Sequence, residues 1–277
     1  MSKVWLVTGS ASGLGRDIAE AVLASGDRLL ATARDPGRLK DLVERYGKQV
    51  STAPLDVTDE AAAKAAVAKA VEVFGRLDVV VNNAGYGDVA PFEQLSSERF
   101  RAVVDTNLFG VVYMTRAAIP VMRKQKSGYI FQISSVGGRL GVPGNAAYHA
   151  AKWAVGGFTE AIAPELAPFG VKICALEPGG IRTNWGKRAI AGAPQLLPDY
   201  EPSVGAFLKM LEGHWGMRRV IRRRSHRSFC NWPLKNSCLR IFCWAAMLCS
   251  MRALRSRSEN PTPRHGMTSA SQPMRRM

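Results

Sequence analysis

Short runs of apolar and β-branched residues alternate with longer helical patterns over most of this chain. The strand-like runs are residues 4–8, 28–33, 51–55, 78–82, 129–134 and 171–176. The helical patterns between them are residues 14–24, 38–45, 61–74, 97–124 and 148–168. Strands that are separated by helical crossovers form parallel sheets covered on both faces. The sequence therefore predicts an α/β fold with a doubly wound parallel sheet and helices on both faces.

The helical pattern over residues 61–74 has local signals at both ends. Thr58 is expected to cap its first turn, and Asp59 and Glu60 favour the positive end of the helix dipole. Gly75 is expected to end it, because glycine adopts the backbone conformation of a helix C-cap at little cost.

Size and composition agree with a globular domain of this kind. The chain has 277 residues, of which 47% are hydrophobic and 22% charged, so a globally disordered or collagen-like protein is excluded. No apolar run reaches the roughly 18 residues that a membrane span needs. The first residues enter a strand-like run without the anatomy of a secretory signal. We therefore expect a cytoplasmic protein with no transmembrane segment.

The positive charge of the chain is concentrated at its C-terminal end. The whole chain has 38 Lys and Arg against 22 Asp and Glu residues; residues 217–277 hold 14 of the former and 1 of the latter. The same segment holds only one of the 26 glycines but four of the five cysteines. We therefore expect a domain over residues 1–216, with a substrate loop over about 184–216, and a basic, Arg/Cys-rich tail over 217–277.

Three interpretations of the tail differ in what they expect of it. A basic arm would bind nucleic acid or an anionic membrane, with Phe242 and Trp244 as apolar anchors. A zinc or redox element is disfavoured, because the cysteines contain no Cys-x2-Cys pair. The loss of glycine, acidic residues and periodicity favours a disordered or out-of-frame segment that did not evolve with this fold. In that case the sheet lacks a normal C-terminal strand.

A glycine-rich turn joins the first strand to the first helix. Gly9, Gly13 and Gly15 permit a tight turn and let the backbone approach a pyrophosphate, which the helix N-terminus then stabilises. Because the turn lies between a strand and a helix, it predicts a dinucleotide site on a Rossmann-type sheet.

The spacing Gly-x3-Gly-x-Gly resembles that of the short-chain dehydrogenase/reductase family. Further matches in the family's order and spacing are Asn82-Asn83-Ala84-Gly85, Asn107, Ser134-Ser135, Tyr148-x3-Lys152 and Pro178-Gly179. Together they span about residues 3–185. The resemblance implies an enzyme that transfers a hydride between a nicotinamide cofactor and an alcohol or carbonyl substrate. Residues 178–185 are most similar to members that act on apolar alcohols such as steroids or retinol.

The resemblance also implies which residues bind the cofactor. Asp56 would hold the adenine amino group, Asn83-Ala84-Gly85 would lie beside the adenosine ribose, and Thr183 would contact the nicotinamide carboxamide. The full expected set is Gly9, Ser10, Ser12, Gly13, Leu14, Gly15, Arg34, Asp56, Val57, Asn83, Ala84, Gly85, Tyr148, Lys152, Pro178, Gly179, Ile181 and Thr183.

The end of the second strand bears on the choice of cofactor. An acidic side chain there would bind the ribose 2′-hydroxyl and repel a 2′-phosphate. Ala33 stands at this place and Arg34 follows, whose planar fork matches a phosphate. The sequence therefore favours NADP(H); NAD(H) is the alternative, because Asp35 is a nearby anion.

Tyr148 and Lys152 share one face of a helix, because they are four residues apart. A tyrosine that exchanges protons at neutral pH needs its pKa lowered by about 3 units from about 10, which corresponds to about 4 kcal/mol. One ammonium about 4 Å away supplies about that amount at an effective dielectric constant of about 20. Burial opposes it, so the oxidised nicotinamide ring is expected to contribute. We predict that Tyr148 is the general acid/base and that Lys152 lowers its pKa.

Ser135 and Asn107 complete the expected catalytic set. Ser135 would hydrogen-bond the substrate oxygen; neighbours on a strand point to opposite faces, and the family's spacing to the tyrosine fits Ser135 better than Ser134. Asn107 is a poor helix-interior residue next to Gly110, and the resemblance implies a local kink there that holds a water linking Lys152 to solvent.

The remaining expectations concern groups outside this set. His149 faces elsewhere on the helix and is expected to be structural, and Gln132 replaces an Asn found in many relatives. No His, Cys and carboxylate set has metal spacing, so no metal is expected. The helical patterns 97–124 and 148–168 typically pair between subunits in the family, which implies a homodimer or homotetramer.

Two other functions compete with this enzyme. One is a catalytically impaired NADP-binding protein that has lost its sheet edge and substrate lid. The other is a protein whose basic tail contacts nucleic acid or a membrane, although no specific nucleic acid is expected for the domain itself. The enzyme hypothesis requires a small-molecule alcohol, ketone or aldehyde as the partner.

Overall fold

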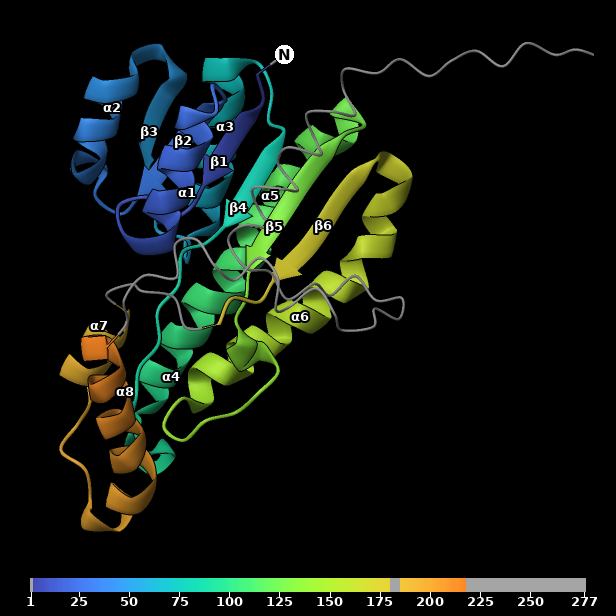
Figure 1. Cartoon of the computed structure of the whole chain (residues 1–277). Helices are drawn as coiled ribbons and strands as arrows, with labels where there is room; N and C mark the ends of the chain where they lie inside the picture. Colours follow the sequence, from blue (N-terminus) through green and yellow to red (C-terminus); the bar gives the residue numbers. More distant parts are fainter. Residues whose placement is uncertain (1, 180–184, 218–277) are drawn as a thin grey trace, which may run out of the picture. The chain divides into compact units, whose positions relative to one another are not determined.

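The computed structural model describes residues 2–179 and 185–217 of the chain (Figure 1). Within them, six parallel strands form one sheet in the order β3-β2-β1-β4-β5-β6. The strands are β1 Val4–Val7, β2 Arg28–Ala33, β3 Val50–Pro54, β4 Val79–Asn82, β5 Gly128–Ile133 and β6 Val171–Leu176. The chain winds from β1 to β3 in one direction and from β4 to β6 in the other. The predicted doubly wound parallel sheet is therefore confirmed.

The winding direction changes between β1 and β4. These strands are paired, with Trp5 opposite Val79 and Val7 opposite Val81. Because the strands are parallel, all of them end at one edge of the sheet, and the connections diverge from each other where the winding reverses. Ligands of such sheets bind in the crevice that this divergence leaves outside the carboxyl ends.

Helices cover both faces of the sheet (Figure 1). Side chains from α3, α5 and α6 share a core with Leu6, Val80 and Ile130, and Met114 of α5 is fully buried there. Right-handed connections place α1 and α2 on the opposite face, where Trp5 stacks on Phe131 with ring centroids 6.5 Å apart. The helices are α1 Gly13–Ala24, α2 Lys40–Tyr46, α3 Glu60–Phe74, α4 Ser97–Val104, α5 Gly110–Gln125 and α6 Ala146–Leu166.

The segment after the 180–184 gap adds two helices, α7 Trp185–Ala191 and α8 Ala206–Met217. A small apolar cluster joins them to the loop after β4 through Val89, Ala189 and Val204. The expected atypical tail and missing last strand fall on residues 218–277, which lie outside the described residues. No helix in the described part of the chain is long and apolar enough to cross a membrane.

Two details differ from the sequence expectations. Asp59 caps α3 by accepting from the backbone N–H groups of Ala61 and Ala62, whereas Thr58 bonds to Asp56 instead. The helical pattern over 97–124 is not one helix, because a π-helical turn, Asp105–Phe109, separates α4 from α5. The Asn107 amide donates to the Val103 carbonyl within this turn, and a side chain bonded to the backbone in this way competes with regular helix geometry.

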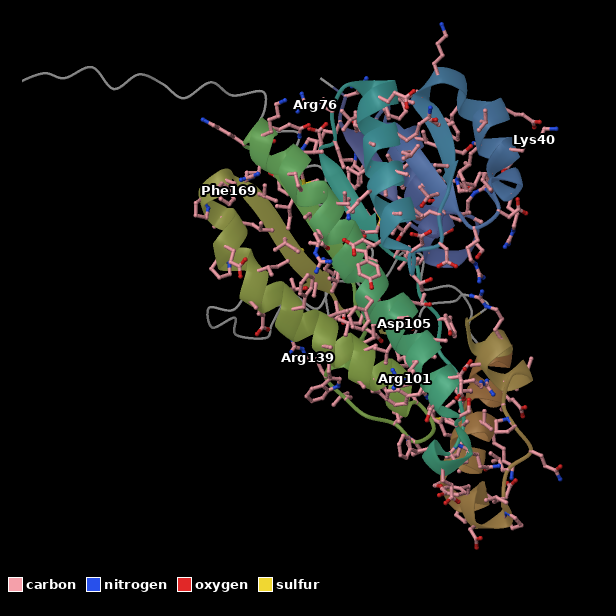
Figure 2. All side chains as sticks on the ribbon, turned by 180° about the vertical axis from the view of Figure 1, so that it is seen from behind. Lys40, Arg76, Arg101, Asp105, Arg139 and Phe169 are labelled. Carbon is pink, nitrogen blue, oxygen red and sulfur yellow. The ribbon has the colours of Figure 1, made fainter. Side chains whose placement is uncertain are left out.

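An ion pair ties the loop after β5 to the end of β6. Arg139, labelled in Figure 2, donates from Nε to Glu177 at 2.8 Å, and Glu177 is 3% exposed. A buried carboxylate needs such a partner. The pair therefore fixes the loop that leads from Ser135 towards α6.

Candidate active site

The turn between β1 and α1 forms a cradle whose shape would fit an anion. Gly9 and Gly13 adopt φ angles of +69° and +57°, which favour glycine. A Cβ on Gly15 would collide with the Gly9 carbonyl and the Asn83 amide. Ser12 precedes α1 in an extended conformation, its side chain makes no capping bond, and the first turn has no acidic residue. The N–H groups of α1 are thus left for an anion.

Thr8 links the turn to the end of β4. Its hydroxyl accepts from the backbone N–H groups of Asn83 and Ala84, both at 2.9 Å. The Asn83 amide donates to the Thr8 carbonyl, also at 2.9 Å. The expected ribose-binding segment is therefore held directly against the glycine turn. Sequence reasoning missed this role, although a threonine at the end of β1 was a visible signal.

Ser10 differs from the other expected cofactor residues. Its side chain is fully buried and donates to the Val7 carbonyl at 2.8 Å, and its backbone N–H donates to Thr32. The hydroxyl and the backbone N–H of Ser10 are therefore both used in bonds within the protein. Ser10 therefore shapes the cradle, while Ser12 and Leu14 are the partly or fully exposed side chains of the turn.

Charged side chains follow the ends of β2 and β3: Arg34 and Asp35 after β2, and Asp56 after β3. Arg34 is exposed directly after β2, and the neighbouring Asp35 accepts from the Gly37 N–H at 2.9 Å. Asp56 accepts from both the backbone N–H and the hydroxyl of Thr58, at 3.0 and 2.8 Å. Hydrogen bonds from the Thr58 backbone and hydroxyl, with a smaller effect of the Arg34 charge, lower the Asp56 pKa. Val57 is buried against Gly110.

The residues after β5 separate the two candidate serines. Ser134 is buried and its hydroxyl donates to the Lys152 carbonyl at 3.2 Å. Ser135 accepts from the Gly137 N–H at 3.0 Å and also hydrogen-bonds the Tyr148 side chain. The structure thus brings Ser135, and not Ser134, to the tyrosine.

Lys152 is buried beside Tyr148. Its side chain is 4% exposed, and Nζ donates to the Ile133 carbonyl at 2.8 Å and lies 5.7 Å from the centre of the Tyr148 ring. Burial lowers the pKa of Lys152 to about 8. The hydrogen bond from Lys152 Nζ to the end of β5 was not predicted from the sequence, because it depends on how α6 packs on the sheet.

The electrostatics of Tyr148 differ from the sequence expectation. Burial raises the pKa of its hydroxyl, and the hydrogen bond with Ser135 opposes that rise. Burial is the larger of these two effects.

Asn107 lies inside the π-helical turn and is fully buried. Its amide nitrogen donates to the Tyr86 and Val103 carbonyls at 2.7 and 2.9 Å, whereas Oδ1 has no partner among the described residues. A Cβ on Gly85 would lie 2.6 Å from Asn107 Oδ1 and 3.6 Å from Lys152 Nζ. The missing side chain of Gly85 therefore leaves space between these two polar atoms.

His149 bridges the loop between Ser135 and α6. Its Nδ1 lies 2.6 Å from the Gly137 carbonyl, and Nε2 accepts from the Val142 N–H at 3.1 Å. This pattern fits the tautomer with the proton on Nδ1. His149 therefore has contacts that suit a structural role, since its ring bonds to Gly137 and Val142 at the two ends of the loop.

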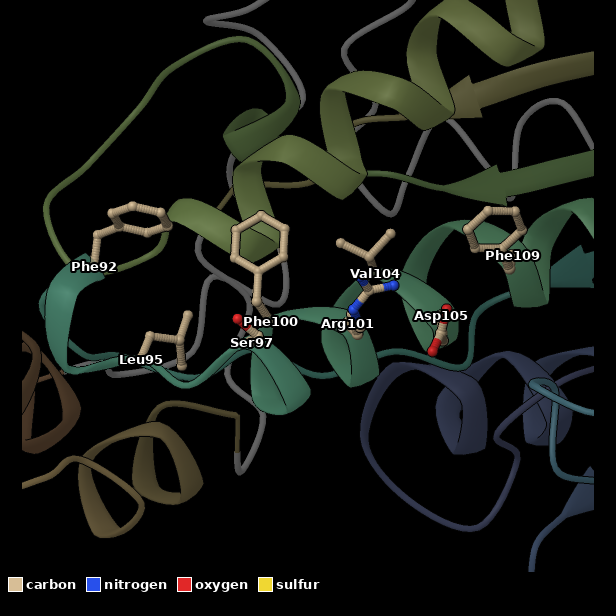
Figure 3. Close-up of a pocket in the computed structure, with 8 residues that line it drawn as sticks. All are labelled: Phe92, Leu95, Ser97, Phe100, Arg101, Val104, Asp105 and Phe109. Atoms are coloured by element: carbon tan, nitrogen blue, oxygen red, sulfur yellow. The ribbon is translucent and has the colours of Figure 1, made fainter.

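The remaining expected cofactor residues follow β6. Pro178 accepts from the Val136 N–H at 3.1 Å, and Gly179 lies in open space, whereas Ile181 and Thr183 lie outside the described residues. In the described ranges no group of His, Cys, Asp and Glu side chains has a metal-binding arrangement. Figure 3 shows an apolar hollow near α4 that contains none of the expected catalytic side chains; its lining is Phe92, Leu95, Ser97, Phe100, Arg101, Val104, Asp105 and Phe109.

Known proteins are similar to this chain over most of its length. A family model described as short chain dehydrogenase matches residues 3–192. The oxidoreductase BOA17 of Botryotinia fuckeliana is 51% identical over 212 residues, covering 76% of this chain and 77% of that protein. The 3-ketodihydrosphingosine reductase of Bacteroides thetaiotaomicron is 36% identical over 211 residues, covering 76% of both chains.

A solved structure is also similar over the same part of the chain. A short-chain dehydrogenase from Streptomyces avermitilis has a TM-score of 0.71 and 41% sequence identity, and the match covers 76% of this chain and 78% of that one.

Proposed function

Because the chain belongs to the short-chain dehydrogenase/reductase family of oxidoreductases, we propose that it transfers a hydride between NADP(H) and an alcohol or carbonyl substrate. The observation that carries the proposal is the arrangement of Ser135, Tyr148 and Lys152. A buried ammonium lies at the face of a phenol that is itself hydrogen-bonded to a serine hydroxyl.

The residues around the β1 turn fit a dinucleotide. Gly9, Gly13 and Gly15 would let the pyrophosphate approach the uncapped N-terminus of α1. Asp56 would accept from the adenine amino group, and Asn83-Ala84-Gly85 would lie beside the ribose. The nicotinamide ring of the bound cofactor would supply or accept the hydride.

Arg34 supports a preference for NADP(H). Its guanidinium is exposed at the end of β2, where a 2′-phosphate would lie. The competing anion, Asp35, is engaged with the Gly37 N–H, which turns one of its carboxylate oxygens back to its own loop. A phosphate would therefore meet a cation there, with the anion partly withdrawn.

Proton transfer belongs to Tyr148 in this proposal. In the direction of reduction its hydroxyl donates a proton to the substrate oxygen, while Ser135 hydrogen-bonds the same oxygen and fixes its position. Because burial raises the pKa of the Tyr148 hydroxyl, the Lys152 ammonium and the positive ring of the oxidised cofactor would have to lower it for proton exchange at neutral pH. A water between Asn107 Oδ1 and Lys152 Nζ, in the space that Gly85 leaves, would connect the pair to solvent.

The proposal also covers the domain bounds, the cellular location and the oligomeric state. We infer a catalytic domain over residues 1–216, a cytoplasmic location, and a homodimer or homotetramer formed through α4–α5 and α6. The impaired NADP-binding protein is the second candidate. A last strand of the sheet would have to come from residues after 216, where the sequence shows no strand periodicity. Binding of nucleic acid or membranes by residues 217–277 would show as salt-sensitive binding that deletion of the segment removes.

The test is NADPH oxidation by the full chain against a panel of aldehydes and ketones that includes 3-ketodihydrosphingosine. We expect turnover by the natural sequence and a loss of about a thousandfold in Tyr148→Phe, as removal of a general acid costs about that much. NADPH-induced thermal stabilisation should persist in the variant. Equal rates for the two proteins would refute the mechanism, and stabilisation without any turnover would favour the impaired binder.

A further inference from the structure

Asn145 has a buried amide without hydrogen bonds. The residue is 2% exposed, and neither Oδ1 nor Nδ2 has a partner among the described residues. Polar atoms buried in native proteins are nearly always paired, and each exception calls for a reason. Asn82 and Asn107 each leave only Oδ1 without a partner among the described residues, because Asn82 Nδ2 donates to Gln132 Oε1 at 2.7 Å and Asn107 Nδ2 donates to the Tyr86 carbonyl at the same distance.

Asn145 lies on the same helix face as the proposed acid/base pair. It immediately precedes α6, and its carbonyl already accepts from the His149 N–H at 2.9 Å, in the helical pattern. Residues at positions i, i+3 and i+7 follow one face of a helix. Asn145, the N-cap residue of α6, precedes Tyr148 by three and Lys152 by seven positions, which puts it at the start of the face that they share.

Apolar side chains from two distant segments lie against Gly144, the residue before Asn145. A Cβ on the adjacent Gly144 would lie 2.9 Å from Val89 Cγ1 and 3.0 Å from Val204 Cγ1. The Gly144 carbonyl also accepts from the Ala90 N–H at 2.9 Å. Val89 belongs to the loop after β4, and Val204 to the segment that follows α7. Asn145 therefore stands in the chain between Gly144, which these apolar side chains contact, and the first turn of α6, which carries Tyr148.

We propose that Asn145 binds a second oxygen of the substrate, a hydroxyl whose oxygen is three bonds from the carbonyl carbon, on a molecule that is otherwise apolar. The proposal rests on the proposed function and names its substrate class, a β-hydroxyketone and the corresponding diol. A hydroxyl can accept from Nδ2 and donate to Oδ1, so one group satisfies both unpaired atoms. The spacing between Asn145 and Tyr148 sets the separation of the two oxygens.

The first experiment measures the selectivity of the natural sequence. Initial rates with NADPH would give kcat/KM for a long-chain β-hydroxyketone and for the ketone of equal length that lacks the hydroxyl. We expect a preference of at least about tenfold for the hydroxyketone, because the plain ketone leaves the amide unpaired in the complex. Equal kcat/KM values would overturn the assignment of Asn145 and leave the proposed function intact. If neither compound nor any other carbonyl is reduced, the proposed function itself fails.

The second experiment tests whether Asn145 is the source of that selectivity. Asn145→Leu should bring the preference close to one by lowering kcat/KM for the hydroxyketone, and Asn145→Ala should do the same if the leucine variant folds poorly. Gln125→Leu is the matched control, because this amide bonds to Leu77, before β4, at the opposite edge of the sheet. It should keep the preference. Equal losses on both ketones in the Asn145 variants would make the residue structural and overturn the proposal.

Discussion

The cofactor end and the reacting end of this crevice treat their buried polar groups differently. At the cofactor end the Thr8 hydroxyl is paired with the backbone of Asn83 and Ala84, and Ser10 is paired inside the glycine turn. At the reacting end Asn107 Oδ1 and both amide atoms of Asn145 have no partners among the described residues. The first arrangement builds a rigid cradle, whereas the second leaves buried hydrogen-bonding capacity for water or substrate.

The largest effect should come from removing a paired group at the cofactor end. Thr8→Val keeps the shape of the side chain but leaves two backbone N–H groups unpaired, so the free energy of unfolding should fall by about 4 kcal/mol. Denaturant unfolding measures this change.

The counterpart at the reacting end should behave in the opposite way. Asn145→Leu removes a buried amide that has no partner, so its melting temperature should rise rather than fall. A comparable loss of stability in both variants would remove the contrast between the two ends.

A buried cation at the reacting end should make stability depend on pH. The pKa of Lys152 is about 8 in the folded protein, against the usual 10.5, because burial disfavours the ammonium. The unfolded chain therefore binds more protons between these values, and the unfolding free energy should increase with pH across this window, by about 3 kcal/mol if the whole shift is expressed.

Unfolding titrations from about pH 7.5 to 9 would measure the rising part of this slope, below the range in which most tyrosines ionise. Lys152→Met should lose it. Lys40→Met, which changes an exposed lysine at the start of α2, should keep it. A slope that survives in Lys152→Met would show that another group causes it.

The shape of the cradle should matter next. Gly15→Ala places a methyl group against the Gly9 backbone, so the turn must shift, and kcat/KM for NADPH should fall by about a hundredfold. Gly157→Ala is the control: this helical glycine of α6 has open space around it, and alanine there should raise stability by up to about 1 kcal/mol. Unchanged NADPH kinetics in Gly15→Ala would contradict the assignment of the turn.

The smallest effect should come from an exposed charge. Arg34→Ala should raise KM for NADPH by about tenfold with little change in kcat, since one charge-assisted contact to a phosphate is lost. KM for NADH should change little. Arg38→Ala removes another exposed cation of the same loop, and an equal effect there would mean that only general charge attraction is at work.

The sequence by itself determined the architecture and most candidate residues, because these depend on local patterns. Strand and helix periodicity predicted the doubly wound sheet, and Gly9, Gly13 and Gly15 predicted the cradle. The Tyr148–Lys152 spacing predicted one shared helix face. Motif spacing was enough to choose Ser135 over Ser134.

Only the tertiary structure decided the properties that depend on burial and on contacts between distant segments. It showed that burial raises the pKa of Tyr148, because the desolvation of a phenolate depends on everything packed around it. It showed Thr8 joining β1 to β4 and a π-helical turn where one helix was expected. It also left the buried amide of Asn145 without a partner among the described residues, next to Gly144, where Val89 and Val204 pack; no local pattern encodes this, because burial there depends on segments far apart in the sequence.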